Sequence, residues 1–330
     1  MKKLSVVLLY LLLVALSSAQ KHVANVLTQS VVEIAPYYKG CQAALSLTFD
    51  DGLLDQYTLA FPQLKQRGLK ATFAIIGSKV GGTIRSKQDH MEGTKGTPVM
   101  TWNMLREMAG YGYEIASHGW EHKAVTRLDA EALHREIGRN DSAIAKEIGQ
   151  RPLTYFYPGN NKSPETIAIC EQDKVGSRTF QLSLGSKRTV EYMRNWVDSL
   201  IVQHKWGVTM THGISQGYDH FQDPTVLWQF LDYIQSLQSQ LWVATFRDVS
   251  AYIRERENCY LTFKESTKEL DINLSTSLSH ALYTHPLTLV IHRPVSSVVQ
   301  DGRPLPFIQS NDLFLVNVNP HGGHITVIKK

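Results

Sequence analysis

The chain has 330 residues and a mass of 37.2 kDa; 43% of its residues are hydrophobic and 19% are charged. This composition is that of a globular protein and excludes a disordered or collagen-like chain. The formal net charge of +4 is too small for the dense basic field that nucleic-acid binding requires, so we expect no nucleic-acid partner. The length suggests one large domain with an appendage, or two medium domains.

The first residues have the pattern of an export signal. Two lysines precede an apolar run from Leu4 to Leu16, and small residues follow it. The pattern predicts a signal peptide over 1–19, cleaved after Ala19, and hence a periplasmic or extracellular protein. An uncleaved anchor is the alternative, but the run of 13 residues is shorter than the ~20 that span a bilayer. We therefore expect no stable membrane anchor.

Between residues 41 and 258, short apolar runs alternate with amphipathic stretches. Strands are predicted for the runs at 44–49, 71–76, 113–117, 153–157, 177–182, 207–211 and 241–246. Helices are predicted between them, at 130–149 after Asp129, from Ser163-Pro164 and at 225–239 after Asp223-Pro224. Strands that alternate with helices form parallel sheets. We therefore predict an α/β fold, a distorted parallel (β/α) barrel of about seven strands, in a domain of residues 20–258.

Two stretches depart from this alternation. Residues 77–100 are polar and glycine-rich, and an insertion of that length indicates a binding-site loop. From residue 259 the helical period is lost, and apolar runs predict a small antiparallel β domain over 259–330, which either binds carbohydrate or packs against the barrel. Cys41 and Cys259 lie beside the first predicted strand and the last predicted helix, so either a disulfide or free thiols are expected there.

Three predicted strands end in the same way, with a polar side chain followed by glycine. They end in Asp50-Asp51-Gly52, His118-Gly119 and His212-Gly213. In parallel α/β barrels the carboxyl ends of the strands share one face, and the active site lies there. We therefore expect these aspartates and histidines to converge, although they are far apart in the sequence.

His118 and His122 are four residues apart, a spacing that places two imidazoles on one face of a helical turn. The spacing alone is weak evidence, because the chain has 13 histidines. Together with Asp51 the two imidazoles form a three-ligand set that leaves one coordination position open, as catalytic zinc sites do. We expect a divalent metal that activates water, with zinc first and cobalt or nickel as alternatives.

Asp50 and His212 supply the acid–base chemistry in this hypothesis. Adjacent carboxylates usually mark a turn or a helix cap, and a shared site requires Asp50 and Asp51 to lie in the turn after Phe49. Asp50 is then the general base and His212 the general acid; the alternative for His212 is a buried histidine bonded to backbone. A metal, a carboxylate base and a histidine acid predict the hydrolysis of an amide or ester.

At these residues the chain resembles the polysaccharide deacetylases with a NodB-type domain, carbohydrate esterase family four. The resemblance covers roughly 41–258 and lies in Thr48-Phe49-Asp50-Asp51-Gly52, His118-Gly119-Trp120-Glu121-His122 and Met210-Thr211-His212, which are similar to the family's first, second and last motifs. It implies the same base, metal ligands and acid. It also implies removal of acetyl groups from acetylated sugars, N-acetyl more than O-acetyl.

The sequence departs from the family pattern in two motifs. In the third motif the family has an arginine that orients the base, but this chain has Phe156 at that position. The resemblance still implies that the backbone N–H of Tyr157 contacts the oxyanion. The fourth motif is not clear; Asp198 is the nearest candidate for orienting His212.

The predicted function is metal-dependent removal of acetyl groups from an acetylated polysaccharide or oligosaccharide. Trp120 and the 77–100 loop are candidates for contacts with the sugar, the alternatives being a core tryptophan and a plain surface loop. Two other functions stay open: a glycan-binding protein that keeps its metal but lacks the orienting arginine, and a hydrolase of small cyclic or formylated amides. Export and a separate β domain favour a polymer as substrate.

Overall fold

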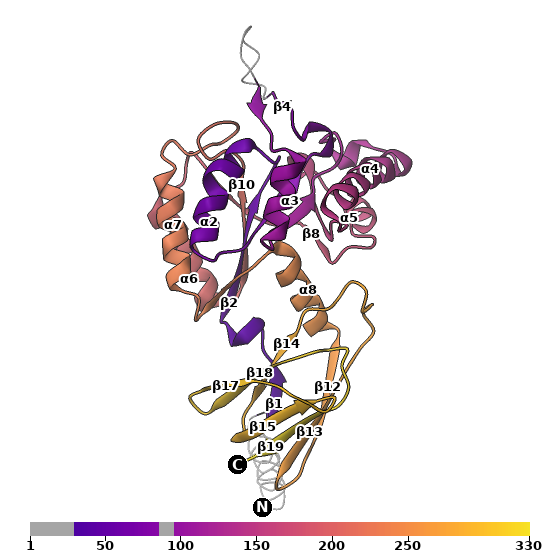
Figure 1. The fold of residues 1–330 in the computed structure, drawn as a ribbon, viewed down its shortest axis with the longest axis vertical. Coiled ribbons are helices and arrows are strands. Elements are labelled where there is room, and N and C mark those ends of the chain that lie inside the picture. Colours follow the sequence, from indigo (N-terminus) through magenta and orange to yellow (C-terminus); the bar gives the residue numbers. More distant parts are fainter. Residues whose placement is uncertain (1–29, 86–95) are drawn as a thin grey trace, which may run out of the picture.

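The computed structural model describes residues 30–85 and 96–330, so the predicted signal peptide lies outside the described residues. Figure 1 shows two parts: a parallel sheet surrounded by helices, and a pair of antiparallel sheets beyond helix α8 (Phe246–Glu257). Within the described ranges no helix is both long enough and apolar enough to cross a membrane.

Eight parallel strands form the sheet of the first part, in the order β8-β7-β6-β3-β2-β10-β9, with β11 paired to β2. Their bounds are β2 Ala43–Phe49, β3 Ala71–Ile75, β6 Glu114–Ser117, β7 Thr154–Phe156, β8 Gly176–Arg178, β9 Leu182–Leu184, β10 Trp206–Thr211 and β11 Leu241–Val243. The end strands β8 and β9 are not paired with each other, so the sheet is a curled, open half-barrel. The predicted distorted barrel is confirmed.

The sequence predicts one strand over 177–182, whereas the structure has two. Strand β8 ends at Arg178, and β9 begins at Leu182 on the opposite edge of the sheet, paired with β10. The chain between them crosses the opening of the half-barrel. Because the run keeps a strand-like composition throughout, its sequence does not show this break.

Helices cover the outside of the curled sheet (Figure 1). They are η2 Gln56–Ala60, α2 Phe61–Gln66, α3 Trp102–Gly110, α4 Ala130–Ile148, α5 Pro164–Cys170, α6 Val190–Gln203 and α7 Thr225–Ser236, besides α8 and short 3-10 turns. Two predicted helix starts are confirmed by their caps. The Asp129 side chain accepts a hydrogen bond from the N–H of Ala132, and Ser163 forms a capping box with Thr166.

Strand β2 is buried along its whole length at the centre of this part. Successive side chains of a strand point to opposite faces, so Leu45, Leu47 and Phe49 join the core under the outer helices. Ser46 and Thr48 are on the other face, inside the curl, where they form hydrogen bonds with Trp206 and Arg178. The same alternation points the next residue of that face, Asp50, into the curl.

The second part consists of two antiparallel sheets with a common core. One sheet contains β1 Val32–Ile34, β14 Leu287–Ile291, β18 Leu313–Val318 and β17 Phe307–Ser310; the other contains β12 Cys259–Glu265, β13 Glu269–Thr276, β19 Ile325–Lys329, β15 Val295–Gln300 and β16 Arg303–Pro304. One of these sheets includes β1, although the sequence analysis assigned its residues to the barrel domain of 20–258. Tyr252 of α8 enters their core and donates a hydrogen bond to the carbonyl of Ala35 (2.8 Å), so this part packs firmly on the barrel.

Two smaller predictions can be placed in the structure. Cys41, Cys170 and Cys259 are all free thiols, so the disulfide alternative is not observed. The inserted 77–100 segment contains the short strands β4 (Thr83–Ile84) and β5 (Thr97–Pro98), which pair with each other. Residues 86–95 between them lie outside the described residues.

Candidate active site

The polar residues at the strand ends converge as the sequence predicts. The N–H of Asp50 donates to the carbonyl of Thr211 (2.8 Å), so β2 and β10 stay paired up to the point where Asp50 and His212 begin. The Nε2 atoms of His118 and His212 each lie 3.9 Å from Oδ2 of Asp50, which is itself 2% exposed. Strands β2, β6 and β10 therefore bring Asp50, His118 and His212 to one face of the half-barrel.

Asp50 and Asp51 share the site because the backbone turns sharply after β2. Asp51 has a φ of +71° and Gly52 a φ of +71°. A positive φ is uncommon for a residue with a Cβ. At Asp51 it removes the strand alternation that would otherwise send the two carboxylates to opposite faces of the sheet.

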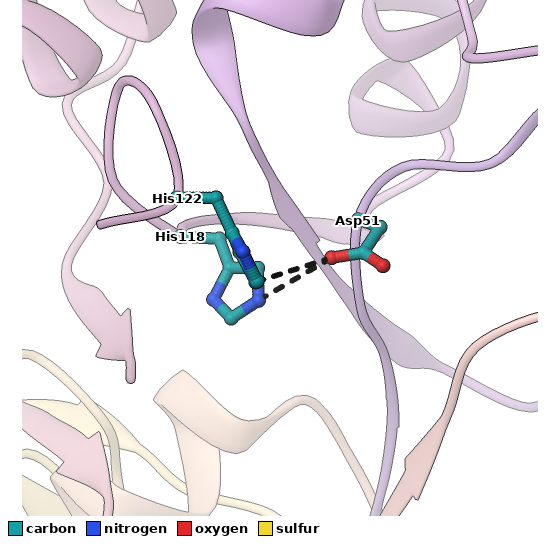
Figure 2. A group of neighbouring side chains, drawn as sticks. All are labelled: Asp51, His118 and His122. Atoms are coloured by element: carbon teal, nitrogen blue, oxygen red, sulfur yellow. Dashed lines mark ion pairs between the residues drawn. The ribbon is translucent and has the colours of Figure 1, made fainter. Parts of the chain in front are cut away.

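Asp51, His118 and His122 form a group that fits a divalent metal (Figure 2). Oδ1 of Asp51 lies 3.5 Å from Nε2 of His118 and 3.7 Å from Nε2 of His122. That oxygen is buried and has no hydrogen-bond partner among the described residues, as expected of an atom that a cation would satisfy. Two imidazoles and one carboxylate are a donor set that zinc binds at catalytic sites.

The two histidines are held in different ways. Nδ1 of His118 bonds to the carbonyl of Phe156 (2.8 Å), which leaves Nε2 directed at Asp51. Such a bond to the second ring nitrogen fixes the orientation of a metal-binding imidazole. The side chain of His122 is 39% exposed. Burial is the main cause that lowers the pKa of His122 to about 4, so this imidazole is neutral, as a ligand must be.

The prediction that the two imidazoles share the face of a helical turn is wrong. Residues 118–123 form a loop, in which Gly119 and His122 have φ angles of +78° and +62°. This loop turns His122 back over His118, with the ring centroids 4.8 Å apart. The two rings thus come together as predicted, but through a loop and not through a helical turn.

Asp50 has a partner that the sequence does not reveal. Arg178 of β8 donates from Nη1 to Oδ1 of Asp50 (2.7 Å) and from Nη2 to Oδ2 (2.5 Å), and both side chains are 3% exposed. Nη1 also donates to Oγ1 of Thr48 (2.7 Å). Burial alone would raise the pKa of Asp50, but Arg178 and then His118 hold it below its ordinary value, so this carboxylate is ionised.

The position of Arg178 accounts for the phenylalanine in the third motif. Phe156 of β7 and Arg178 of β8 are cross-strand partners in the parallel ladder. The guanidinium carbon lies 4.3 Å from the centroid of the Phe156 ring, a cation–π contact. An arginine therefore reaches the carboxylate from the strand beside the motif position, and the phenylalanine supports it.

The loop that carries His212 is fixed by two residues that follow Asp51. The side-chain N–H groups of Gln56 donate to the carbonyls of Asp50 (2.6 Å) and His212 (2.9 Å). Asp55 accepts hydrogen bonds from three successive backbone N–H groups after His212, those of Ile214, Ser215 and Gln216. The ring of Tyr218 lies edge-on to His212, at 5.0 Å between centroids.

Of two weaker predictions, the contacts contradict the one for Asp198, and the one for Trp120 stays a prediction. Asp198 is exposed on α6 and accepts a hydrogen bond from Tyr233, while Nδ1 of His212 has no partner in the described part of the chain, so Asp198 does not orient His212. Trp120 is half-buried. A Cβ at Gly77 would collide with its ring, and Arg139 lies over that ring at 4.8 Å. The contacts with Gly77 and Arg139 agree with the alternative that Trp120 is a packing residue.

The oxyanion role of the Tyr157 N–H stays a prediction that the geometry does not favour. The peptide between Phe156 and Tyr157 turns its carbonyl toward His118. In a trans peptide the N–H points to the opposite side from the carbonyl, so this N–H points away from His118. The Tyr157 hydroxyl is also occupied, donating to Oγ of Ser177 (2.7 Å).

Beside the metal group lies a pocket of 440 Å³ lined by Asp51 and His122 together with Ile76, Lys79, Thr83, Ile84, Arg85 and Glu121. It includes residues of β4, so the inserted 77–100 segment does form one wall of the cleft. The volume lies within the range of pockets that hold small ligands.

Known proteins match the part of the chain that contains this site. A family model described as polysaccharide deacetylase matches residues 38–176. The YxkH protein of Bacillus subtilis (strain 168) is 28% identical over 134 residues, 41% of this chain and 43% of the relative. A chitin deacetylase of Pestalotiopsis sp is 30% identical over 132 residues, 39% of this chain and 39% of the relative. The chain thus spans less than half the length of these curated relatives.

The fold is similar to a known one as well. A crystal structure of a Mycobacterium smegmatis protein has a TM-score of 0.51 and 14% identity, covering 68% of this chain and 94% of that one. At this identity the likeness concerns the fold alone. The family match includes Asp50, Asp51, His118 and His122, whereas Arg178 and His212 lie beyond it. On the motifs and the family match, residues 38–176 of the chain belong to the polysaccharide deacetylase family.

Proposed function

We propose that the protein is a metal-dependent hydrolase that removes acetyl groups from an acetylated polysaccharide or oligosaccharide, N-acetyl more than O-acetyl. The observation that carries the proposal is the adjacency of two groups. The metal-binding set of Asp51, His118 and His122 lies beside an ionised carboxylate, Asp50, with His212 at 3.9 Å from that carboxylate. Relatives named as chitin and peptidoglycan N-acetylglucosamine deacetylases support the acetylated-sugar substrate.

Each side chain has a defined task in this mechanism. A cation held by Asp51, His118 and His122 would act as a Lewis acid, which lowers the pKa of water and polarises the acetyl carbonyl. Asp50, kept ionised by Arg178, accepts the proton of the attacking water. His212, with its Nε2 atom 3.9 Å from Oδ2 of Asp50, donates a proton to the departing sugar nitrogen or oxygen.

The ion pair of Arg178 and Asp50 weighs against a protein that only binds glycans. That alternative depends on the absence of an arginine to orient the base, and Arg178 occupies this position in space. A buried ion pair is costly to form, since both ions lose their hydration. A site that only binds a metal and a sugar has no need of it.

The proposal also includes the location and the metal. From the signal peptide predicted over 1–19 we infer export of the enzyme to the periplasm or the extracellular space. Zinc is the first candidate for the metal, with cobalt or nickel as alternatives. Nitrogen and carboxylate donors suit all three ions.

The test is acetate release by the metal-supplied protein from a panel of N-acetylated and O-acetylated oligosaccharides. We expect turnover on N-acetylated chains and a fall of about 10²- to 10⁴-fold in Asp50→Asn, the range for loss of a general base. Asp232→Asn is the matched control, because Asp232 is an exposed partner of Arg67 on α7. Absence of acetate release from every substrate, or full activity in Asp50→Asn, would contradict the proposal.

A further inference from the structure

Glu136 of α4 accepts three backbone hydrogen bonds from the loop that carries His122. Its Oε1 accepts from the backbone N–H groups of Glu121 (2.6 Å) and Lys123 (3.4 Å), the two residues that flank His122. Its own backbone carbonyl accepts from the N–H of Trp120 (3.2 Å). The Glu136 side chain is buried, with 5% of the residue exposed.

The loop passes so close to this carboxylate that it depends on a glycine. A Cβ on Gly119 would lie 3.0 Å from Oε1 of Glu136 and 3.4 Å from the hydroxyl of Tyr155. Gly119 also has a φ of +78°, which a residue with a Cβ rarely adopts. The carboxylate and the glycine together determine the path of the chain between the two imidazoles.

The other backbone hydrogen bonds of this loop, from the N–H of Gly77 to the carbonyl of Gly119 (3.4 Å) and from the N–H of Ser78 to the carbonyl of Trp120 (3.0 Å), do not reach the residues that flank His122. The ring of His118 is anchored through Phe156 and is 1% exposed, whereas the ring of His122 makes no hydrogen bond to any described residue and is 39% exposed. His122 also has a φ of +62°, which an unsupported loop would relax. The hydrogen bonds to Glu136 act on the two residues that flank His122 and so help to hold this imidazole opposite Asp51.

We propose that Glu136 is a positioning residue of the metal centre, whose carboxylate sets the affinity for the metal by fixing the loop on both sides of His122. The proposal rests on the metal site of the proposed function. Residues that orient metal ligands from outside the coordination sphere typically change metal affinity by about 10- to 100-fold when they are replaced. An effect of that size is expected here, although Glu136 is not one of the three residues grouped as metal ligands.

The experiment measures the dissociation constant of Zn²⁺ in chelator-stripped protein by competition with a chromophoric chelator. Glu136→Ala removes the acceptor and should weaken Zn²⁺ binding by about 10- to 100-fold. Glu136→Gln keeps an acceptor oxygen and should restore most of the affinity. Glu131→Ala is the matched control, since Glu131 is on the same helix, exposed, and paired only with Arg135; its affinity should equal that of the wild type.

The metal-free melting temperature separates positioning from simple stability. If Glu136→Ala lowers that temperature but binds Zn²⁺ as the wild type does, Glu136 is only structural and the proposal is overturned. Should Glu136→Ala not fold, Glu136→Asp withdraws the carboxylate by one methylene and should still weaken binding; unchanged affinity would overturn the proposal equally. A wild-type protein that binds no Zn²⁺ would instead refute the metal site of the proposed function.

Discussion

Asp50 at the strand ends and Glu255 on α8 are both buried carboxylates, but they have opposite surroundings. Asp50 receives two hydrogen bonds from Arg178. Glu255 is 0% exposed, neither of its oxygens has a hydrogen-bond partner among the described residues, and Nε2 of His321 is 3.8 Å away. The pKa of Asp50 is lowered, whereas burial raises the pKa of Glu255 to about 8.

The difference shows that burial makes an ionised carboxylate unfavourable, and that a neighbouring cation decides whether the carboxylate stays ionised. At the active site the chain retains an ionised carboxylate, because Arg178 offsets its desolvation. At the junction with the antiparallel sheets, no lysine or arginine of the described residues forms an ion pair with Glu255, and Glu255 is neutral at pH 7. The chain maintains a buried negative charge where the proposed chemistry needs a base.

The largest effect is expected from removing the cationic partner of Asp50. Arg178→Met leaves that carboxylate buried and unpaired, which should cost about 3–5 kcal/mol of unfolding free energy. The pKa of Asp50 rises, so the acid limb of the pH profile of kcat/KM moves to higher pH, because the base must be ionised to act. Denaturant unfolding and a pH–rate profile measure the two effects.

A second buried ion pair provides the control for Arg178. Lys174 and Asp141 are each 3% exposed and lie away from the site. Lys174→Met should destabilise the fold by a similar amount and leave the pH profile unchanged. The double variant Arg178→Met/Asp50→Asn should recover part of the lost stability. If Arg178→Met keeps the wild-type profile, Arg178 does not act on the base.

The next effect concerns the carboxylate without a partner. The pKa of Glu255 is raised in the folded state, so the stability linked to its proton is complete below about 4.5 and is lost as the pH rises through about 8. The titratable groups beside it are His321, whose ring lies 4.8 Å from that of His280 at an angle of 45°, and the thiol of Cys259. Wild-type stability should therefore fall between pH 5 and pH 9.

Glu255→Gln removes this proton linkage. At pH 9 it should be more stable than the wild type by a few kcal/mol, with ~5 as an upper bound from the size of the pKa shift, while at pH 5 the two should be close. Glu257→Gln is the control, an exposed residue of the same helix that pairs with Arg256. Parallel stability curves for wild type and Glu255→Gln would show that Glu255 is not buried as a neutral acid.

The smallest effect compares two buried tyrosines. The hydroxyl of Tyr157 donates to Ser177, whereas the hydroxyl of Tyr155 has no hydrogen-bond partner within the described residues. Tyr157→Phe should cost about 1 kcal/mol, the net value of one hydrogen bond, and Tyr155→Phe should be close to neutral. Neither should change kcat, which acetate release at saturating substrate measures. Equal costs would mean that the partner is not what stabilises Tyr157.

Local patterns were sufficient to predict most of the fold and the outline of the site. The strand-end aspartates and histidines could be found because each follows an apolar run and precedes a glycine or a second aspartate. The caps of α4 and α5 were visible for the same reason, since they depend on residues three positions apart. Parallel strands then bring distant ends to one face without further information.

Contacts across the sheet could not be predicted in this way. Arg178 lies inside a strand-like run, and only the register of β7 and β8 places it beside Phe156 and over Asp50. An arginine inside a predicted strand of the sheet was the one available hint, because a buried guanidinium needs an anionic partner. Glu136 was hidden similarly, as one acidic residue among several on an amphipathic helix. The path of the loop at 118–123 determines which of these acidic residues accepts its backbone hydrogen bonds.

The central claim is that Asp51, His118 and His122 hold one divalent cation on which the chemistry of Asp50 depends. The most direct test is to strip the protein with a chelator, add Zn²⁺ stepwise, and follow bound metal and acetate release from an N-acetylated oligosaccharide in the same samples. We predict that both rise together and level off at one equivalent per chain. Full acetate release by the stripped protein before any metal is added would contradict the claim.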